Sequence, residues 1–308
     1  MPEKKIVSLL AAGTEIVYAL GKGDALVGRS HECDFPSEAL VLPACSSVKF
    51  APDLSSTEID RKVKEILTEA LSIYTVDKEM IRQLSPDVII TQTQCEVCAV
   101  SLKDVEDALG SLLDKNAEII SLSPNLLGDI FADIRNIARQ LNVPEKGEEV
   151  IESLEERIDL IRHKLKFITE RPDVFVVEWL SPLMVAGNWT PELVEIAGGV
   201  PIMAEKGRHS PFIDYESLRA ADPDIIVVSP CGFSIERTMS EISLLLELPG
   251  WNALKAIKNN RFYIADGNHY FNRSGPRIVD TIEILAEIIN PKQFIFGYEG
   301  AGWLKFEV

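Results

Sequence analysis

The chain has 308 residues, of which 46% are hydrophobic and 26% charged, a composition typical of a folded protein whose length suits two lobes better than one. Disordered, collagen-like and coiled-coil chains are thereby excluded. Aspartate and glutamate number 48 against 31 lysines and arginines, which leaves a net charge of -17. Such a charge repels nucleic-acid phosphates and anionic lipid, so we expect no nucleic-acid partner.

The beginning of the chain predicts a strand, not a targeting segment. Only residues 6–10 are apolar before Ala and Gly, and no run approaches the roughly 20 residues that a membrane-spanning helix needs. We therefore expect no membrane insertion. Five cysteines are an odd number, and a chain of this size can build its core without disulfides, which favours reduced thiols and a cytoplasmic location. An export signal missing from this sequence would instead place the protein outside the cytoplasm.

Seven short β-branched runs next to turn residues predict buried strands. The amphipathic stretches between them predict helices, and the regular alternation indicates parallel sheets with helices on both faces. The predicted strands are residues 5–9, 25–28, 87–91, 118–122, 174–178, 224–229 and 261–265.

One long helix is predicted near mid-chain, from Pro144 to about Ile168, because apolar residues recur there at three- and four-residue spacing and the only glycine is Gly147. About 22 residues at 1.5 Å each would span about 33 Å, enough to cross a domain. The chain is thus expected to have three parts: an N-terminal α/β lobe of residues 1–143, a connecting helix of residues 144–170, and a C-terminal α/β lobe of residues 171–308.

A motif occurs on both sides of this helix. The pattern D-x-E-x-x-R-x-x-x-P-D-x-I begins at Asp77 and again at Asp214, 137 positions later. It predicts a helix with N-terminal carboxylates, a Pro-Asp turn and a strand. A second pair relates residues 15–17 and Gly21 to residues 192–194 and Gly198, 177 positions later. Together the two repeats favour two similarly built lobes.

Further motifs are spread over the chain: Ile6-Val7-Ser8-Leu9, Thr14-Glu15-Ile16, Ala19-Leu20-Gly21, Val27-Gly28, Cys33-Asp34-Phe35-Pro36, Ser85-Pro86-Asp87-Val88-Ile89-Ile90, Ala197-Gly198-Gly199 and Phe271-Asn272-Arg273-Ser274-Gly275-Pro276-Arg277. With these motifs the chain, from about residue 5 to 290, resembles the substrate-binding proteins of cobalamin and iron-chelate uptake systems. Most similar is the cobalamin-binding branch, and within it a cytosolic-looking group. The resemblance implies an α/β fold of two doubly wound Rossmann-like lobes with parallel sheets, joined by one long rigid helix, and a ligand cleft between the lobes.

Four of the five cysteines lie just after predicted strands: Cys33, Cys95, Cys98 and Cys231. A free cysteine is usually a small buried hydrophobe. Four thiols at equivalent loop positions can also form a zinc or iron site or a redox pair, and both interpretations stay open. Cys45 is a spare candidate that the sequence does not place.

Two tryptophans follow the first strand of the second lobe, at Trp179 and Trp189, flanked by Gly, Pro and Asn188. A large flat ligand can stack on such rings, although Trp179 can equally pack between sheet and helix. Trp189, beside a helix N-terminus, is the better candidate for ligand contact.

The loop after the last clear strand combines amide, aromatic and cationic groups, in Asn268, Tyr270, Phe271 and Arg273. A solvated turn does not account for this combination. We expect a planar, tetrapyrrole-like ligand between Trp189 and the loop.

The remaining candidate ligand-binding residues are Thr14, Glu15, His31, Cys33, Glu96, His209 and Phe233. Most of them lie in loops at strand ends. Thr14 can instead be the N-cap of the first helix, whose backbone amides also suit an anionic group. In the family's arrangement His209 would face the cleft.

The chain lacks the G-x-S-x-G, P-loop, G-x-G-x-x-G and H-E-x-x-H motifs, so standard hydrolase and nucleotide chemistry is not expected. The resemblance implies a binding protein, not an enzyme, that clamps a corrinoid, another tetrapyrrole or a different metal chelate and requires no cofactor. Exported members dock a surface carboxylate from each lobe on the membrane component of an ABC transporter. The matching first-lobe position, near Val100, has no carboxylate, which argues against that partner.

A cytoplasmic metal- or thiol-dependent enzyme, or a metal-handling protein, that reuses the same scaffold is the alternative. The four loop cysteines favour it. Protein purified without oxygen would separate the two hypotheses, because a corrin band indicates binding whereas stoichiometric zinc or iron with thiolate bands indicates a metal site.

Overall fold

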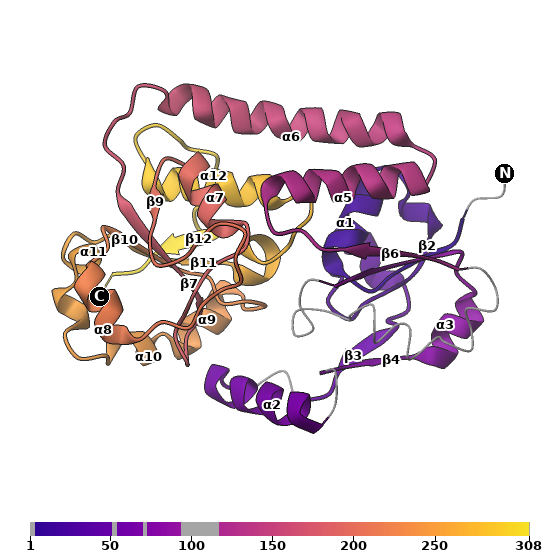
Figure 1. Ribbon diagram of the computed structural model, residues 1–308, viewed down its shortest axis with the longest axis horizontal. Helices are drawn as coiled ribbons and strands as arrows, with labels where there is room; N and C mark the ends of the chain where they lie inside the picture. The colour runs from indigo at the N-terminus through magenta and orange to yellow at the C-terminus, as the bar shows by residue number, and fades with distance from the viewer. Residues whose placement is uncertain (1–3, 51–53, 70–72, 94–116, 308) are drawn as a thin grey trace. The chain divides into compact units, whose positions relative to one another are not determined.

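The computed structural model describes residues 4–50, 54–69, 73–93 and 117–307. The described residues group into two compact units. The first unit draws on the ranges 1–54, 61–124 and 128–153, and the second on 55–60, 125–127 and 154–308. All seven predicted strands are present, and each unit is of the predicted α/β class (Figure 1).

The first unit is built on a four-stranded sheet in the order β2-β1-β5-β6, and every neighbouring pair is parallel. Its strands are β1 (Ile6–Ser8), β2 (Leu26–Arg29), β5 (Val88–Gln92) and β6 (Glu118–Leu122). All five residues of β5 are buried, as a strand covered on both faces requires. The helices α1 (Ala11–Ala19) and α5 (Leu127–Gln140) cover one face, and α3 (Lys78–Leu84) covers the other (Figure 1).

A two-stranded antiparallel sheet lies outside the sequence prediction. It pairs β3 (Ser46–Val48) with β4 (Tyr74–Val76), and α2 (Ser56–Glu69) connects them in the chain. Three-residue strands carry too little alternation to be recognised from sequence. Two short 3₁₀ helices complete this part of the chain, η1 (Gly23–Ala25) and η2 (Ser37–Val41).

The second unit is built on a larger sheet in the order β12-β11-β10-β7-β8, with β9 also paired to β7. The pairs among β7, β9, β10 and β11 are parallel, whereas β8 and β12 are antiparallel to their neighbours. The prediction of parallel sheets thus misses two short antiparallel strands. The strands are β7 (Asp173–Trp179), β8 (Met184–Val185), β9 (Val200–Pro201), β10 (Ile225–Val228), β11 (Phe262–Ala265) and β12 (Trp303–Lys305).

Helices cover both faces of this sheet, with α7 and α12 on one face and α8, α9 and α11 on the other (Figure 1). The core of this unit is mostly aliphatic and contains an aromatic contact, in which the Trp251 and Phe262 rings meet edge to face with centroids 5.5 Å apart. The elements are α7 (Thr190–Ile196), α8 (Tyr215–Ala221), α9 (Ile235–Glu241), α10 (Ser243–Leu246), η4 (Trp251–Ala253), α11 (Lys255–Lys258), the π-helical turn η5 (Gly267–Phe271) and α12 (Ile278–Ile289).

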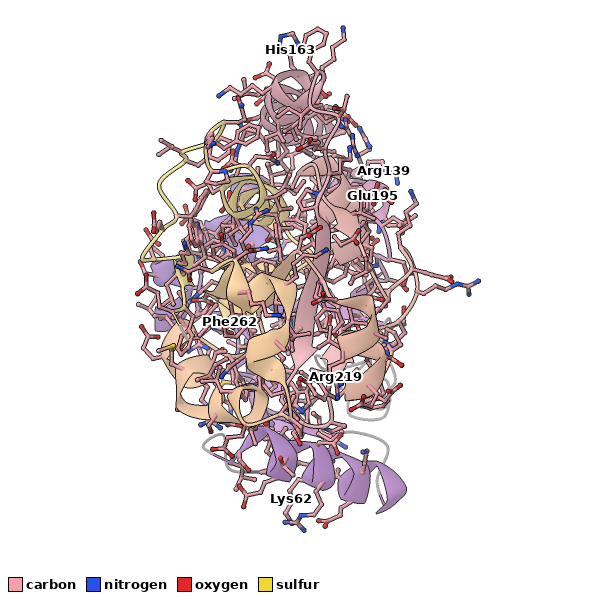
Figure 2. The ribbon with its side chains drawn as sticks, turned by 90° about the vertical axis from the view of Figure 1, so that its left-hand side faces the viewer. Lys62, Arg139, His163, Glu195, Arg219 and Phe262 are labelled. Atoms are coloured by element: carbon pink, nitrogen blue, oxygen red, sulfur yellow. The ribbon has the colours of Figure 1, made fainter. Side chains whose placement is uncertain are left out.

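The long mid-chain helix is confirmed as α6 (Pro144–Leu165), which runs without a break (Figure 1). Of its predicted apolar positions, four are buried (Leu154, Ile158, Ile161 and Leu165) and Val150 is half-buried, whereas His163 is exposed and projects outward from the helix (Figure 2). The division between the two units falls inside α6, at residues 153 and 154. The lobe limits at residues 143 and 170 remain a prediction. No helix in the described ranges is long and apolar enough to cross a membrane.

The two units share one strand order, since β2-β1-β5-β6 in the first corresponds to β9-β7-β10-β11 in the second. The repeated motif has the same structure in both. Asp77 caps α3 by accepting from the N–H of Met80, and Asp214 caps α8 by accepting from that of Ser217. The second repeat is equivalent too, because Gly21 and Gly198 follow α1 and α7 with φ of 70° and 93°.

Candidate functional site

The strand order of the second unit defines where a ligand can enter. β7 is its first strand and lies between β9 and β10. The chain therefore adds its next parallel strand, β9, on one side of β7 and the following one, β10, on the other side. In open α/β sheets ligands bind at this switch point, outside the carboxyl ends of the strands. Trp179 ends β7, and residues 229–233 follow β10 at the same edge. We therefore take this edge as the candidate site.

Three loops at this edge are tied together by hydrogen bonds. The N–H of Cys231 donates to the carbonyl of Glu178 at 3.1 Å, which links the β10 loop to β7. The N–H of Asn268 donates to the carbonyl of Phe233 at 3.1 Å, which links the β11 loop to the β10 loop. Asn272 adds a side-chain bond of 3.4 Å to the carbonyl of Ser229. Such cross-links hold side chains from three loops in one arrangement.

Gly267 makes the close approach of two of these loops possible. A Cβ at this position would lie 2.1 Å from the carbonyl oxygen of Pro230 and 2.7 Å from that of Ser229. Both are backbone atoms, so no other residue fits without separating the loops. Gly232, with φ of 75°, allows the turn in which the N–H of Phe233 donates to the carbonyl of Pro230.

An aromatic pair lies at the switch point. The rings of Trp179 and Phe233 are tilted, with centroids 5.3 Å apart, and Trp179 is the half-buried member. The guanidinium of Arg237 lies 4.9 Å from the Phe233 centroid and forms an ion pair of 2.6 Å with Glu241. The half-buried Trp179 thus packs on Phe233, and Phe233 packs on the cation of Arg237.

Polar groups of the β11 loop lie beside this pair. Asp266 caps the π-helical turn by accepting from the N–H of His269 at 2.7 Å, and its other oxygen lies 2.7 Å from Nδ1 of the same residue. Arg273 is buried and donates to the side-chain oxygen of Asn268 at 3.3 Å. The loop therefore offers an imidazole, an amide and a buried guanidinium at one sheet edge.

Trp189, the preferred candidate for ligand contact from the sequence, is a buried residue. It is 7% exposed, and its indole N–H donates to the carbonyl of Phe271 at 3.0 Å. Phe271 is itself 2% exposed, and Tyr270 packs edge to face on Tyr298. Trp189 anchors the loop from inside the unit, whereas Trp179 is half-buried, and contact of either ring with a ligand stays a prediction. The spacing of the two tryptophans in the sequence does not indicate which of them is buried in the core.

Asn188 and His209 occupy neighbouring loop strands near Trp189. The N–H of Asn188 donates to the carbonyl of Arg208, and the carbonyl of Asn188 accepts from the N–H of Gly207 at 2.8 Å. Asn188 has φ of 49°, a conformation that asparagine tolerates. His209 is exposed, with Nδ1 3.0 Å from its neighbour's carbonyl. Its contact with a ligand stays a prediction.

At the corresponding edge of the first unit, polar side chains are hydrogen-bonded to one another. Nδ1 of His31 lies 2.9 Å from the Ser46 hydroxyl, which in turn bonds to that of Ser30 at 3.2 Å. The imidazole also packs on Tyr74, with centroids 5.5 Å apart. Burial, assisted by the charge of Arg29, lowers the pKa of His31, so it is neutral near pH 7.

Thr14 and Cys33 meet in the same network. The Thr14 hydroxyl donates to Sγ of Cys33 at 3.1 Å, and both residues are fully buried. The prediction of Thr14 as an N-cap is wrong: α1 begins at Ala11, after Leu10, because two alanines extend the helix by one turn. Glu15 is also buried, at 3% exposure.

The thiols form no metal cluster in the described part of the chain. No group of three or more His, Cys, Asp or Glu side chains is placed there to hold a metal ion. Cys231 is half-buried, and burial raises the pKa of the Cys45 thiol to about 11, which disfavours its thiolate. Glu96, Cys95 and Cys98 lie outside the described residues, so the four-thiol site remains a prediction.

His269 and Asp266 are the residues at this edge that sequence reasoning missed as functional candidates. The available signal was the D-x-x-H spacing directly after a strand, which brings both side chains to one side of a single turn. Arg237 was also missed, because nothing in the sequence relates it to Phe233 before the loop geometry is known.

The sequence matches the family described as periplasmic binding protein over residues 6–268. The chain belongs to this family. It is similar to an ABC transporter substrate-binding lipoprotein of Bacillus subtilis, with 25% identity over 297 residues, 94% of this chain and 81% of that protein. It is also similar to the vitamin B12-binding protein of Vibrio parahaemolyticus, with 24% identity over 91% of this chain and 87% of the relative.

Solved structures give the same fold. The periplasmic vitamin B12 binding protein of Vibrio cholerae superposes with a TM-score of 0.66, 22% identity and coverage of 95% of this chain and 98% of that one. A periplasmic heme binding protein of Pseudomonas aeruginosa gives a TM-score of 0.68 at 20% identity, with 94% of each chain covered. The predicted family and the predicted two-lobed α/β fold are confirmed, and a binding protein, not an enzyme, is what the family implies.

The prediction of a cytoplasmic location is wrong. The relatives are described as periplasmic or as a lipoprotein, which points to a location outside the cytoplasm. An odd number of cysteines argues against a full set of disulfides but does not report the compartment, because exported proteins can also retain free thiols. The cytosolic-looking branch named from the sequence is not supported either.

Proposed function

We propose that this substrate-binding protein takes up a cobalamin-like metal chelate at the carboxyl edge of the second unit's sheet. The observation that carries the proposal is the position of Trp179 and Phe233 at the β7/β10 switch point, where ligands of such sheets bind. A corrin ring is broad and flat, and an indole backed by a second aromatic ring suits it. Asn268 and Arg273 supply polar groups for the ring's amide edges.

The relatives support this ligand class. Several curated relatives are vitamin B12-binding proteins, at 22% to 24% identity over nine-tenths of this chain. Solved relatives of the same fold include heme-binding proteins, and likeness at that level of identity speaks for fold alone. Cobalamin is therefore the first ligand to test, with heme as the second.

We further propose that the ligand is handed to the membrane component of an ABC transporter. One relative is described as an ABC transporter substrate-binding lipoprotein, which supports this partner. The sequence argument against this partner rests on Val100, which lies outside the described residues.

Titration of the purified protein with cyanocobalamin, followed by tryptophan fluorescence and calorimetry, tests the ligand. Replacing Trp179 by alanine is expected to lower affinity by roughly three- to tenfold, since a stacked aromatic contributes about 0.5–1.5 kcal/mol beyond its buried area. Phe167→Ala is the matched control, because Phe167 is an aromatic residue that is 85% exposed. Absence of binding to cyanocobalamin and hemin would contradict the proposal.

The alternative of a metal- or thiol-dependent enzyme has no observation in its favour beyond the cysteine positions. Cys33 is fully buried and accepts a hydrogen bond from Thr14, an arrangement that suits packing. Metal analysis of protein purified without oxygen distinguishes this alternative, because stoichiometric zinc or iron would restore it.

A further inference from the structure

Glu287 of α12 is a buried carboxylate, 4% exposed, that accepts hydrogen bonds from the end of the chain. Its Oε1 accepts from the backbone N–H groups of Phe296 and Gly297, the latter at 2.6 Å. Its Oε2 accepts from the backbone N–H of Tyr298 at 3.3 Å and from the indole N–H of Trp303 at 2.8 Å. An ionised carboxylate has about four lone-pair sites, and these donors fill them.

These hydrogen bonds hold residues 296–303, which we call the C-terminal clasp. Successive backbone N–H groups that converge on one anion form a nest, and Gly297, with φ of 99°, adopts the left-handed conformation that such a turn uses. The carboxylate of Glu287 depends on these donors in turn, because a buried charge without partners is costly. Glu287 and the clasp are therefore expected to stay together as one structural piece.

The clasp lies against the start of the β11 loop. Trp303, its last residue, begins β12 and pairs with Ala265, the last residue of β11. The N–H of the next residue, Asp266, donates to the carbonyl of Gly302 at 2.9 Å. The point at which the loop leaves the sheet is thus fixed by the clasp.

The clasp also contacts the middle of the same loop. Tyr270 packs edge to face on Tyr298, with ring centroids 5.9 Å apart. Gly302 makes room for this contact, because a Cβ there would lie only 3.3 Å from Cε2 of Tyr270 and 3.0 Å from Cδ1 of Ile284. The loop is therefore supported by the clasp at two separate points.

We propose that Glu287 is a positioning residue for the ligand: by holding the C-terminal clasp, it determines where the β11 loop presents Asn268 and Arg273. This inference rests on the proposed function. It adds to the ligand site an element that lies beyond residues 6–268, the range of the family match. Glu287 acts through the backbone of the clasp and the loop, without touching the ligand.

The test compares Glu287→Ala with the wild type in the whole protein, by calorimetric titration with cyanocobalamin and by amide hydrogen exchange. The affinity is expected to fall by about tenfold, the lower end of what the loss of a supporting group costs at metal sites. The N–H of Asp266 is expected to exchange faster, because its acceptor, the carbonyl of Gly302, moves with the clasp.

Ile289→Ala is the matched control for a loss of stability alone. Ile289 is a buried residue of the same helix, and its Cδ1 lies 3.1 Å from the position of a Cβ on Gly199. The cavity should lower the melting temperature, as Glu287→Ala also should. The affinity of the folded protein and the exchange of the Asp266 N–H should stay at their wild-type values.

Trp303→Phe provides a second variant, which decides the question if Glu287→Ala does not fold. It removes one donor to Glu287 and keeps a ring on Tyr263, which Trp303 meets with centroids 5.6 Å apart. We expect roughly two- to fivefold weaker binding of cyanocobalamin, because the other donors remain.

Three outcomes overturn the inference. If Glu287→Ala binds cyanocobalamin as tightly as Ile289→Ala, Glu287 is not a positioning residue, and the proposed function stands. Wild-type affinity of Trp303→Phe, where Glu287→Ala is unfolded, leads to the same conclusion. If the wild type binds neither cyanocobalamin nor hemin, the proposed function fails, and the role of Glu287 fails with it.

Discussion

Arg157 of α6 and Glu283 of α12 form a two-pronged ion pair, with Nε to Oε1 at 2.9 Å and Nη2 to Oε2 at 2.6 Å. Asp280 accepts from the same guanidinium at 2.5 Å, and the Tyr298 hydroxyl donates to Glu283 at 2.9 Å. Glu283 is 8% exposed, so its charge depends on Arg157 for compensation. The hydrogen bond from Arg157 to Glu283 is the main reason that the pKa of this arginine is raised. The cluster thus fastens the second half of α6 to α12.

Arg157→Ala is therefore expected to lower the free energy of unfolding by about 3 kcal/mol, because it leaves the buried Glu283 and the half-buried Asp280 without a counter-charge. Arg162→Ala, five residues further along α6, removes an exposed pair with Asp159 and should cost at most about 0.5 kcal/mol. Urea unfolding of both variants gives the comparison. If both variants lowered the free energy of unfolding equally, the ion pairs of Arg157 would be screened by solvent like an exposed surface pair.

The repeated motif shows which structural features can be predicted from the sequence alone. The spacing from Asp77 to Ile89 predicts helix, turn and strand, and the structure repeats these down to the αL residues that end the helices, Ser85 and Asp222, with φ of 49° and 45°. Local hydrogen bonds determine all of these features, so they can be predicted from neighbouring residues. Because the two halves are equivalent, they share the same strand order.

The equivalence of the two caps makes a quantitative prediction. Asp77→Ala and Asp214→Ala should each lower the free energy of unfolding by about 1 kcal/mol. Each change removes a carboxylate that accepts a hydrogen bond from the backbone N–H three residues further along the chain. The double variant should show the sum, because the motifs belong to different units. Thermal or urea unfolding measures all three. Asp→Asn at either position keeps the cap and serves as the control.

The candidate site could be predicted less well. Sequence identified the loops after β7, β10 and β11, because their position depends on strand ends. It could not rank Trp179 above Trp189, since the burial of Trp189 depends on a hydrogen bond to Phe271, 82 residues away. Nor could it separate His269 from its loop neighbours, because its orientation depends on the π-helical turn.

Asp133 on α5 gives stability a pH dependence. Burial, reinforced by the charge of Asp129, raises the pKa of Asp133 to about 7, and its Oδ2 has no hydrogen-bond partner among the described residues. The folded state therefore holds this proton more tightly than the unfolded chain does. The stability from the protonated form is present below about pH 4 and is lost as pH rises to about 7.

Asp133→Asn mimics the protonated form, so the variant should melt at a higher temperature than wild type at pH 8 and show a smaller difference at pH 5. Asp159→Asn, at an exposed position of α6, should show no such trend. Scanning calorimetry at the two pH values measures the differences. A gain that is larger at pH 5 would have the wrong sign and would contradict the raised pKa.

The close approach at Gly267 connects the fold to ligand binding. In Gly267→Ala the new Cβ would press on the carbonyl oxygens of Pro230 and Ser229, and neither backbone atom can move without breaking the bond between Asn268 and Phe233. The β10 and β11 loops should therefore separate, with a fall in melting temperature and at least about a tenfold loss of cyanocobalamin affinity, comparable to other disruptions of supporting groups.

Gly128→Ala is the matched control. A Cβ at Gly128 meets nothing within 4 Å, and the change should stabilise α5 by about 0.5–1 kcal/mol while leaving binding intact. If Gly267→Ala bound cyanocobalamin as tightly as Gly128→Ala, the linked loops would not be what positions the ligand, and Trp179 would have to act without them.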